Sequence, residues 1–284
     1  MKKSRKTFWV VWRRFKRNRF AVIGFWIIVA FTFLAIAAPW ISPYDPNEQD
    51  LLASLQGPSL KHPFGVDFFG RDILSRVIWG ARVSLTISVE AVAIAVILGV
   101  TLGAISGFYG GAVDEVIMRI MDVFLAIPDI LLAIAIVAAL GPGTFNLVLA
   151  ISIYSMPQFA RVARSAVLVE RKKEYVESAR AIGESSLSML FRYVLPNSIS
   201  PILVQATLRM ARAILSVAGL GFLGLGIQPP TPEWGTDLSQ ARTYLQIAPH
   251  TGIFPGLAVF LIVMGFNFLG DGLNDALNPR LKDR

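Results

Sequence analysis

The sequence predicts an all-helical integral membrane protein. Apolar residues make up 54% of its 284 positions, charged residues only 16%, and the mean hydropathy is +0.58. A soluble domain of this composition would lack the polar groups to cover its surface. Long apolar segments recur along the chain, and most basic residues fall between alternate pairs of them. Membrane topology therefore accounts for the formal charge of +8 without a nucleic-acid partner.

Six segments are long enough to cross a bilayer, which requires ~20 apolar residues in a helix. They are residues 20–41, 83–106, 120–140, 144–164, 198–225 and 256–275. No small-residue cleavage site follows the first segment, so we expect it to be a retained signal-anchor helix.

The distribution of basic residues orients these spans. Residues 1–19 hold nine Lys or Arg and no acidic residue, which places the N-terminus in the cytoplasm by the positive-inside rule. In the alternating topology that follows, 20 of the 27 basic residues lie in inner segments and five in outer segments. We therefore expect a multi-pass protein of the cytoplasmic (inner) membrane with both termini in the cytosol.

The same topology divides the chain into five parts. They are a cytosolic basic amphipathic segment (1–19), an anchor helix (20–41), an extracytoplasmic loop (42–82), a transmembrane domain of five helices (83–275) and a cytosolic tail (276–284). Aromatic and basic residues alternate in the first part, as in helices that lie at a membrane interface. This segment either contacts lipid or a partner, or serves only to set the topology.

The polar loop at 165–197, within the fourth part, is predicted to be a helix, a turn and a second helix. Gly183 separates two amphipathic stretches, and glycine tolerates the left-handed conformation that ends a helix. Ser185 or Ser186 can cap the helix that follows. Leu187, Leu190, Phe191 and Val194 form its apolar stripe, and Pro196 is expected to stop it.

This loop resembles the EAA loop of ABC importer permeases, whose coupling helix fits a groove on a separate ATPase subunit. The positions that match the motif residue by residue are Glu177, Ala179, Gly183, Leu195 and Pro196. Ser178 stands where a second alanine is usual, and Tyr193 where isoleucine is usual. The alternative is an ordinary amphipathic loop.

Further segments are similar to the permeases of dipeptide, oligopeptide and nickel importers. Residues 62–76 resemble the external signature of that family, with Val66 in place of a threonine, and residues 107–122 resemble its inner turn. Also similar are Phe222 to Gly226, Pro229-Pro230, Glu233 to Gly235 and Asn267 to Pro279. The resemblance covers nearly the whole chain in order.

The resemblance implies the fold of a type I ABC importer permease, with six transmembrane helices and a cytosolic coupling loop. It also implies a non-catalytic subunit that binds no cofactor, with ATP and Mg on two partner ATPase subunits. A second homologous permease subunit would complete a heterodimeric pore, and an extracytoplasmic solute-binding protein would deliver the cargo. Glu177 and Gly183 would position and turn the coupling element, while Leu187, Leu190 and Phe191 would fill the ATPase groove.

Charged residues in the outer signature are candidates for contact with the binding protein. These are Asp67, Arg71, Asp72 and Arg76. They can pair locally and order a surface that faces the partner. The alternative is a loop whose charges satisfy one another and that makes no contact.

Ionisable residues within the spans are candidates for the translocation pathway, because such groups are costly in lipid and usually face a cavity or a partner. Glu90 lies roughly 10 Å from the outer end of its span, and Arg212 about 9 Å from the outer end of its own, at 1.5 Å per residue. We expect these two to pair, with Arg209 one turn deeper as a pore-lining charge. Alternatively, they face a partner subunit or extend separately toward the interface.

Glycines at 219, 221, 224 and 226 allow either close helix packing or an interruption of the fifth span. In the second case Phe222 would project as a constriction of the pathway.

Enzyme motifs are missing from the sequence. It contains no G-x-x-x-x-G-K-[ST] phosphate loop, no H-E-x-x-H and no cysteine, and its two histidines, His62 and His250, lie in outer segments. ATP must then be handled by another polypeptide. A secondary transporter is the remote alternative, but that class needs coupling-ion carboxylates near the middle of the membrane, and these are scarce here. Peptide is the first choice of cargo and nickel or a nickel chelate the second.

Overall fold

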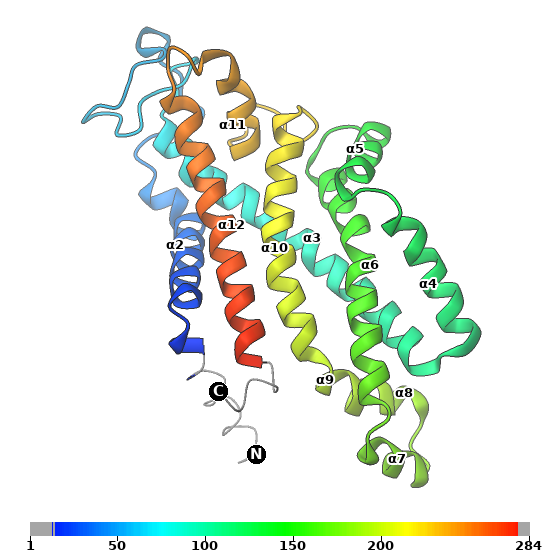
Figure 1. Cartoon of the computed structure of the whole chain (residues 1–284). Coiled ribbons are helices and arrows are strands. Elements are labelled where there is room, and N and C mark those ends of the chain that lie inside the picture. The colour runs from blue at the N-terminus through cyan, green and yellow to red at the C-terminus, as the bar shows by residue number, and fades with distance from the viewer. Residues whose placement is uncertain (1–12, 14, 278–284) are drawn as a thin grey trace.

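The computed structural model describes residue 13 and residues 15–277. All long elements in this part of the chain are helices (Figure 1). The long helices are α2 (Arg19–Ile41), α3 (Ile73–Tyr109), α4 (Gly111–Leu125), α5 (Asp129–Leu140), α6 (Thr144–Glu170), α10 (Ile199–Phe222) and α12 (His250–Leu277). The shorter ones are η1 (Leu51–Ala53), α7 (Glu174–Ala181), α8 (Ser186–Ser188), η2 (Met189–Val194), α9 (Leu195–Asn197), α11 (Trp234–Ala241) and η3 (Arg242–Tyr244). The predicted all-helical class is confirmed. The predicted interfacial segment at 1–19 and the tail at 276–284 lie mostly outside the described residues.

Within the described residues, four helices are long and apolar enough to span a membrane, namely α2, α3, α10 and α12. A fifth span results if α4 and α5 are taken as one, although they meet at a bend of 86°. The predicted third span, 120–140, is therefore broken, because Pro128 precedes α5 and cannot continue α4. The predicted fourth span corresponds to α6. This helix is 27 residues long, but its polar side chains make it less apolar than a typical membrane-spanning helix.

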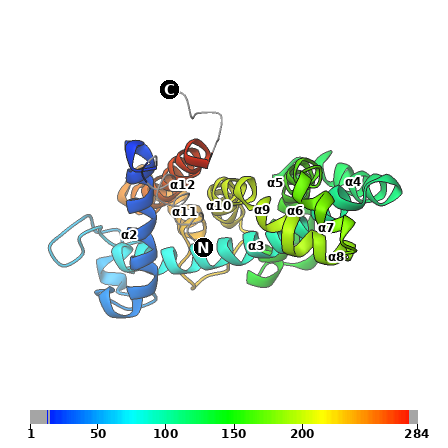
Figure 2. The same ribbon diagram turned by 90° about the horizontal axis from the view of Figure 1, so that it is seen from below.

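The long helices lie side by side in the order α2, α12, α10, α6 and α4, with α3 crossing behind them (Figure 1). Seen from below, α3 runs along one side of the molecule from the α2 end to the α6 end (Figure 2). At 37 residues α3 extends ten residues beyond the predicted span on the outer side. It starts there because Asp72 caps it, accepting a hydrogen bond from the Ser75 amide at 2.7 Å. The main apolar core lies among α3, α6, α10 and α12.

Three glycines one turn apart bring α3 against α6. A methyl group added at Gly99 or Gly103 would collide with the carbonyl oxygen of Met156 or Ala160, and one added at Gly107 would come within 2.8 Å of the Arg164 carbonyl oxygen. The two backbones are thus in contact along about two helical turns, as in small-xxx-small packing between membrane helices. This spacing is visible in the sequence, but the contact between α3 and α6 was not predicted from it.

Candidate functional site: the loop at 165–197, the charges within the helices and the network of buried ions

The loop at 165–197 has the predicted turn between two helical pieces. Gly183 follows α7 with φ of +83°, a conformation in which an added Cβ is strained. Ser185 caps the next helix by accepting a hydrogen bond from the Ser188 amide at 3.3 Å. Both predictions are confirmed. Pro196 does not stop this second helix, because it lies in the first turn of α9, where a missing N–H donor is tolerated.

One face of the loop packs onto α3 and α6. The apolar cluster consists of Ala104, Phe108, Val167, Val176, Ala179, Met189, Leu190 and Val194. Leu190 is 0% exposed and Ala179 only 6%. The structure therefore corrects the prediction for Leu190, which is inside the chain and unavailable to a partner groove. The predicted helical periodicity of the apolar residues was right, but Leu190 and Val194 face α3 and α6.

The opposite face exposes apolar side chains that nothing in the described chain covers. Ile182 is 80% exposed, Leu187 59% and Phe191 45%. Glu177 and Pro196 are also exposed, and Leu195 is half-buried. Leu187 and Phe191 thus lie where the prediction placed them. Ile182 was not predicted as part of this surface, whereas Val176 and Ala179 of the preceding helix are buried.

Polar contacts fix the loop to the helices above it. Arg171 donates from Nη1 to the carbonyl oxygens of Gly107 and Phe108, each at 2.8 Å, and so caps the end of α3. The Tyr175 hydroxyl donates to Glu170 at 2.6 Å, and Lys173 pairs with the same carboxylate at 2.6 Å. Partial burial and the adjacent Glu170 carboxylate raise the pKa of Tyr175 to about 12, so its hydroxyl keeps the proton it donates.

The mid-membrane charges are arranged differently from the prediction. Arg209 is 2% exposed and donates from Nη1 to the Asp129 carboxylate at 3.1 Å. The other nitrogen of its guanidinium, Nη2, is buried without a hydrogen-bond partner. Glu90 and Arg212 are both exposed and are not among the ion pairs of the described residues. The predicted Glu90 to Arg212 pair is therefore wrong, because similar depth along two helices does not bring them to the same face.

The glycines after residue 218 end the fifth span instead of interrupting it. Helix α10 ends at Phe222, and Gly224 has φ of +78°. Gly221 packs closely against Glu233, as the packing alternative predicted. Phe222 is 37% exposed, and the Arg242 guanidinium lies 5.9 Å from its ring centre. It is at the outer end of α10, where its role in the pathway remains a prediction.

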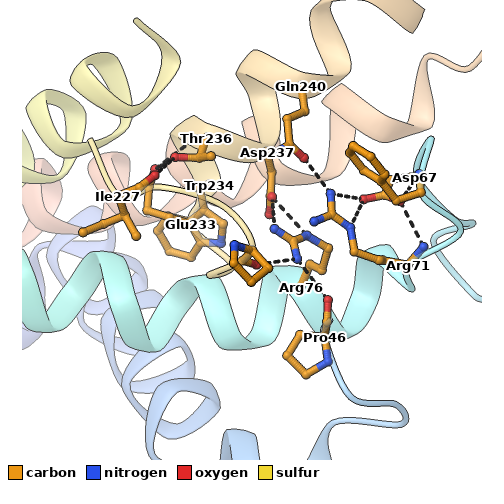
Figure 3. A network of polar contacts seen from close by, with 12 residues as sticks. Pro46, Asp67, Arg71, Arg76, Ile227, Glu233, Trp234, Thr236, Asp237 and Gln240 are labelled. Carbon is orange, nitrogen blue, oxygen red and sulfur yellow. Dashed lines mark hydrogen bonds and ion pairs between the residues drawn. The ribbon is translucent and has the colours of Figure 1, made fainter. Parts of the chain in front are cut away.

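A network of buried ions joins the outer loop to α3 and α11 (Figure 3). Arg76 pairs with Asp237 and donates to the carbonyl oxygens of Pro46 and Pro230 at 3.0 and 3.3 Å. Arg71 donates to Asp67 and to Gln240, each at 2.6 Å. These contacts join residues up to 169 positions apart in the sequence. They connect residues 46–76 with residues 230–240, and we call this structure the outer cap.

The predicted contact residues of the outer signature are mostly inside this cap. Arg71, Asp72 and Arg76 are each 2% exposed, so they hold the cap together and cannot themselves touch a partner. The alternative of charges that satisfy one another was right for Asp67 and Arg71. The partners of Arg76 and Asp72 were not predicted. Asp72 caps α3 and accepts a hydrogen bond from Nδ1 of His62 at 2.9 Å.

Glu233 anchors α11 beneath this cap. It is 0% exposed and accepts hydrogen bonds from the Thr236 amide at 2.9 Å and from Ser84 of α3 at 3.0 Å. Burial raises the pKa of this carboxyl group above its ordinary value, although the hydrogen bonds it accepts oppose the shift. Beside the cap, a cavity of about 220 Å³ is lined by Phe68, Arg76, Asp237 and Tyr244 among others.

The fold defines a multi-span helical membrane protein, and the loop at 165–197 exposes apolar side chains on one face. Comparison with known families then assigns it. The model of the binding-protein-dependent transport system inner membrane component matches residues 99–283, and the model of the N-terminal transmembrane domain of oligopeptide transport permease C matches residues 7–58. The chain belongs to the binding-protein-dependent transport system inner membrane component family.

Curated relatives extend the match over the whole chain. A dipeptide transport system permease of Alkalihalophilus pseudofirmus is 49% identical over 95% of this chain and 89% of its own length. A glutathione transport system permease of Escherichia coli is 50% identical over 95% and 90%. A di/tripeptide transport system permease of Pseudomonas aeruginosa is 47% identical over 96% and 92%. All three are named as permease proteins.

A solved structure of the MetNI methionine ABC transporter contains a similar chain. The two superpose with a TM-score of 0.58 at 17% identity, over 72% of this chain and 98% of the other. This likeness confirms the predicted fold of an ABC importer permease.

Proposed function

We propose that this chain is a permease subunit of an ATP-driven importer of dipeptides and short oligopeptides in the cytoplasmic membrane. The observation that carries the proposal is the two-sided loop at 165–197. One face of the loop packs against α3 and α6, while the opposite face leaves Ile182, Leu187 and Phe191 exposed. Exposed apolar side chains on a polar loop are typical of a protein interface.

The partner on this surface is an ATPase subunit, because the chain lacks a phosphate-binding loop of its own. In this proposal two ATPase subunits supply ATP, Mg and hydrolysis, and this chain binds no cofactor. A second permease subunit completes the pore. It covers the exposed face of α10 that carries Arg212, and it also covers Glu90 of α3. Both side chains sit at membrane depth, where an uncovered charge is costly.

An extracytoplasmic binding protein delivers the cargo to the outer cap, and the two termini lie in the cytosol with the loop. The side chains available to that partner are the exposed ones beside the buried network, such as Phe68, Leu52 and Leu60. The cargo is assigned from the names of the relatives, which are permeases for dipeptides, di/tripeptides and glutathione. These names favour peptide over nickel.

The coupling surface is tested by comparing two leucines three residues apart. Leu187→Glu should leave the chain folded in the membrane and abolish ATP-dependent dipeptide uptake, because it places a charge in the ATPase interface without disturbing the core. Leu190→Glu should instead destabilise the chain itself, because it buries a charge among α3 and α6. The measurements are uptake into proteoliposomes, copurification of the ATPase subunits and thermal unfolding of the permease.

The control is Leu187→Met, which keeps an apolar side chain and should retain uptake. Normal uptake by Leu187→Glu would refute the assignment of this face to the ATPase. A wild-type complex that transports no peptide, with or without its binding protein, would refute the proposed cargo.

A further inference from the structure

The ion pair between Asp129 and Arg209 lies near the middle of the membrane. Arg209 is ten residues from the start of α10 and thirteen from its end, which corresponds to roughly 15 and 20 Å along the helix axis at 1.5 Å per residue. An ion pair at this depth marks a functional site more often than a structural one. It is also incompletely satisfied, since Nη2 of Arg209 is buried without a partner.

The break between α4 and α5 brings Asp129 to this position. The carboxylate is the first residue of α5, where the positive end of the helix dipole favours a negative charge. Its side chain is 36% exposed, in contrast to 1% for Arg209. Asp129 is thus the accessible member of the pair. The exposed cation of Arg212 lies less than one turn from Arg209 along α10.

A groove with a mixed polar and apolar lining lies beside the pair, because it is lined by Leu125, four residues before Asp129, and by Gln205, four residues before Arg209. Its volume is about 670 Å³, and its lining includes Gln158, Arg161 and Ser165 of α6 and Gln205 of α10. Gln205 is one helical turn below Arg209 on the same helix. The size lies within the ~300 to 1,000 Å³ typical of sites for small ligands. Apolar side chains such as Leu125 and Val162 alternate there with amide, hydroxyl and guanidinium groups, a combination that suits a peptide with its polar backbone and its side chains.

We propose that Asp129 and Arg209 are a recognition site for zwitterionic peptides, which exchange the internal ion pair for two pairs with the termini of the cargo. The peptide ammonium group binds Asp129, and its carboxylate binds Arg209, including Nη2, with Arg212 beside it. This inference rests on the proposed function, because it takes a peptide as the cargo.

The exchange explains why the charges are tolerated at this depth. Separating a buried ion pair is costly unless each member gains a new partner. A zwitterion supplies both partners at once, whereas a peptide blocked at either end leaves one charge uncompensated. An extended dipeptide spans at most about 7 Å, so only a small displacement of α5 from α10 is needed.

The test is equilibrium binding of radiolabelled alanyl-alanine to the purified complex of permease and ATPase subunits, without the binding protein. Wild type should bind it. N-acetyl-alanyl-alanine and alanyl-alanine amide should each compete at least tenfold more weakly than unlabelled alanyl-alanine. Asp129→Asn and Arg209→Gln should each weaken binding tenfold or more. Arg209→Lys keeps the charge beside Asp129, so it should fold and still lose affinity for the carboxylate end.

Glu115→Gln is the matched control, since Glu115 is an exposed carboxylate on α4 away from the pair, and it should bind like wild type. Equal competition by the three compounds, or wild-type affinity in the Asp129 and Arg209 variants, would overturn the inference. So would the absence of binding in a wild-type complex that imports alanyl-alanine when the binding protein is added. Absence of that import would refute the proposed function instead.

Discussion

At the scale of single residues, the chain places several ionisable groups away from water and gives each a defined set of partners. Glu233 differs from the others, because the groups that meet it are hydroxyl and amide donors and no cation. Arg76 and Asp237, which belong to the same outer cap as Glu233, form an ion pair with each other. A carboxyl group that is held by hydroxyl groups and backbone amides and lies near the Asp237 carboxylate is sensitive to its own protonation.

The pH dependence of stability follows from this environment. Because burial raises the pKa of Glu233 in the folded chain, the folded chain holds a proton that the unfolded chain has released. The stabilisation is fully present below the ordinary value of 4.5 and is lost as the pH rises through the raised value. We expect the thermal unfolding midpoint of the purified permease to fall as the pH rises above 4.5.

In Glu233→Gln the part of this fall that is due to residue 233 should disappear, because the amide can keep the contacts to Ser84 and Thr236 without a charge. Glu48→Gln alters an exposed carboxylate of the outer loop and should leave the fall unchanged. An identical pH profile for wild type and Glu233→Gln would contradict the expectation.

At the scale of elements, local signals were enough for some features of the loop and not for others. Gly183 and Ser185 were predicted because a left-handed turn and a helix cap depend on one residue and its neighbours. The direction in which Leu190 faces depends on α3 and α6, which pack against it from more than 20 residues away in the sequence. Periodicity identifies an apolar stripe but does not say whether the chain itself or a partner covers it.

The same limit applies to the pair of Asp129 and Arg209. These residues are 80 apart in sequence, and only the bend after Pro128 brings the first of them to α10. Depth along a helix can be counted from the sequence, whereas rotation about the helix axis depends on packing. The pairing of Glu90 with Arg212 failed for this reason.

Helix packing between α3 and α6 gives a prediction at this scale. Gly103→Ala should destabilise the chain by about 1 to 3 kcal/mol, the usual cost of overpacking, because the new methyl group meets the backbone of Ala160, which cannot turn aside. Thermal unfolding in detergent measures the loss. Gly219→Ala is the matched control, since Gly219 is also helical and nothing lies within 4 Å of its Cβ position. Equal effects at the two positions would rule out the close contact.

At the scale of the whole molecule, composition and charge distribution were sufficient to predict a multi-span helical protein. The family assignment agrees with this class, and the relatives of similar length are membrane permeases. The composition did not predict the outer cap, in which residues 46 to 76 and residues 230 to 240 form one network. Contacts over such separations require the folded chain.

The orientation in the membrane can be tested directly because the sequence contains no cysteine. Gln49→Cys in the outer loop should react with a membrane-impermeant maleimide on intact cells. Ser186→Cys in the coupling loop should react only after the membrane is permeabilised. Both positions are exposed in the structure, so accessibility within the chain is not limiting. The reverse pattern of labelling would invert the predicted topology.

The close approach of α3 and α6 has a consequence for how the molecule can move. With backbone against backbone there is no layer of side chains between them to repack, so the two helices must travel as a single rigid body. The cluster around Leu190 attaches the coupling loop to that body. In the proposed function, a displacement imposed on Leu187 by an ATPase subunit would then carry α3 and α6 together. We therefore expect the surfaces that slide during transport at the α6 to α10 groove and at the bend before Asp129.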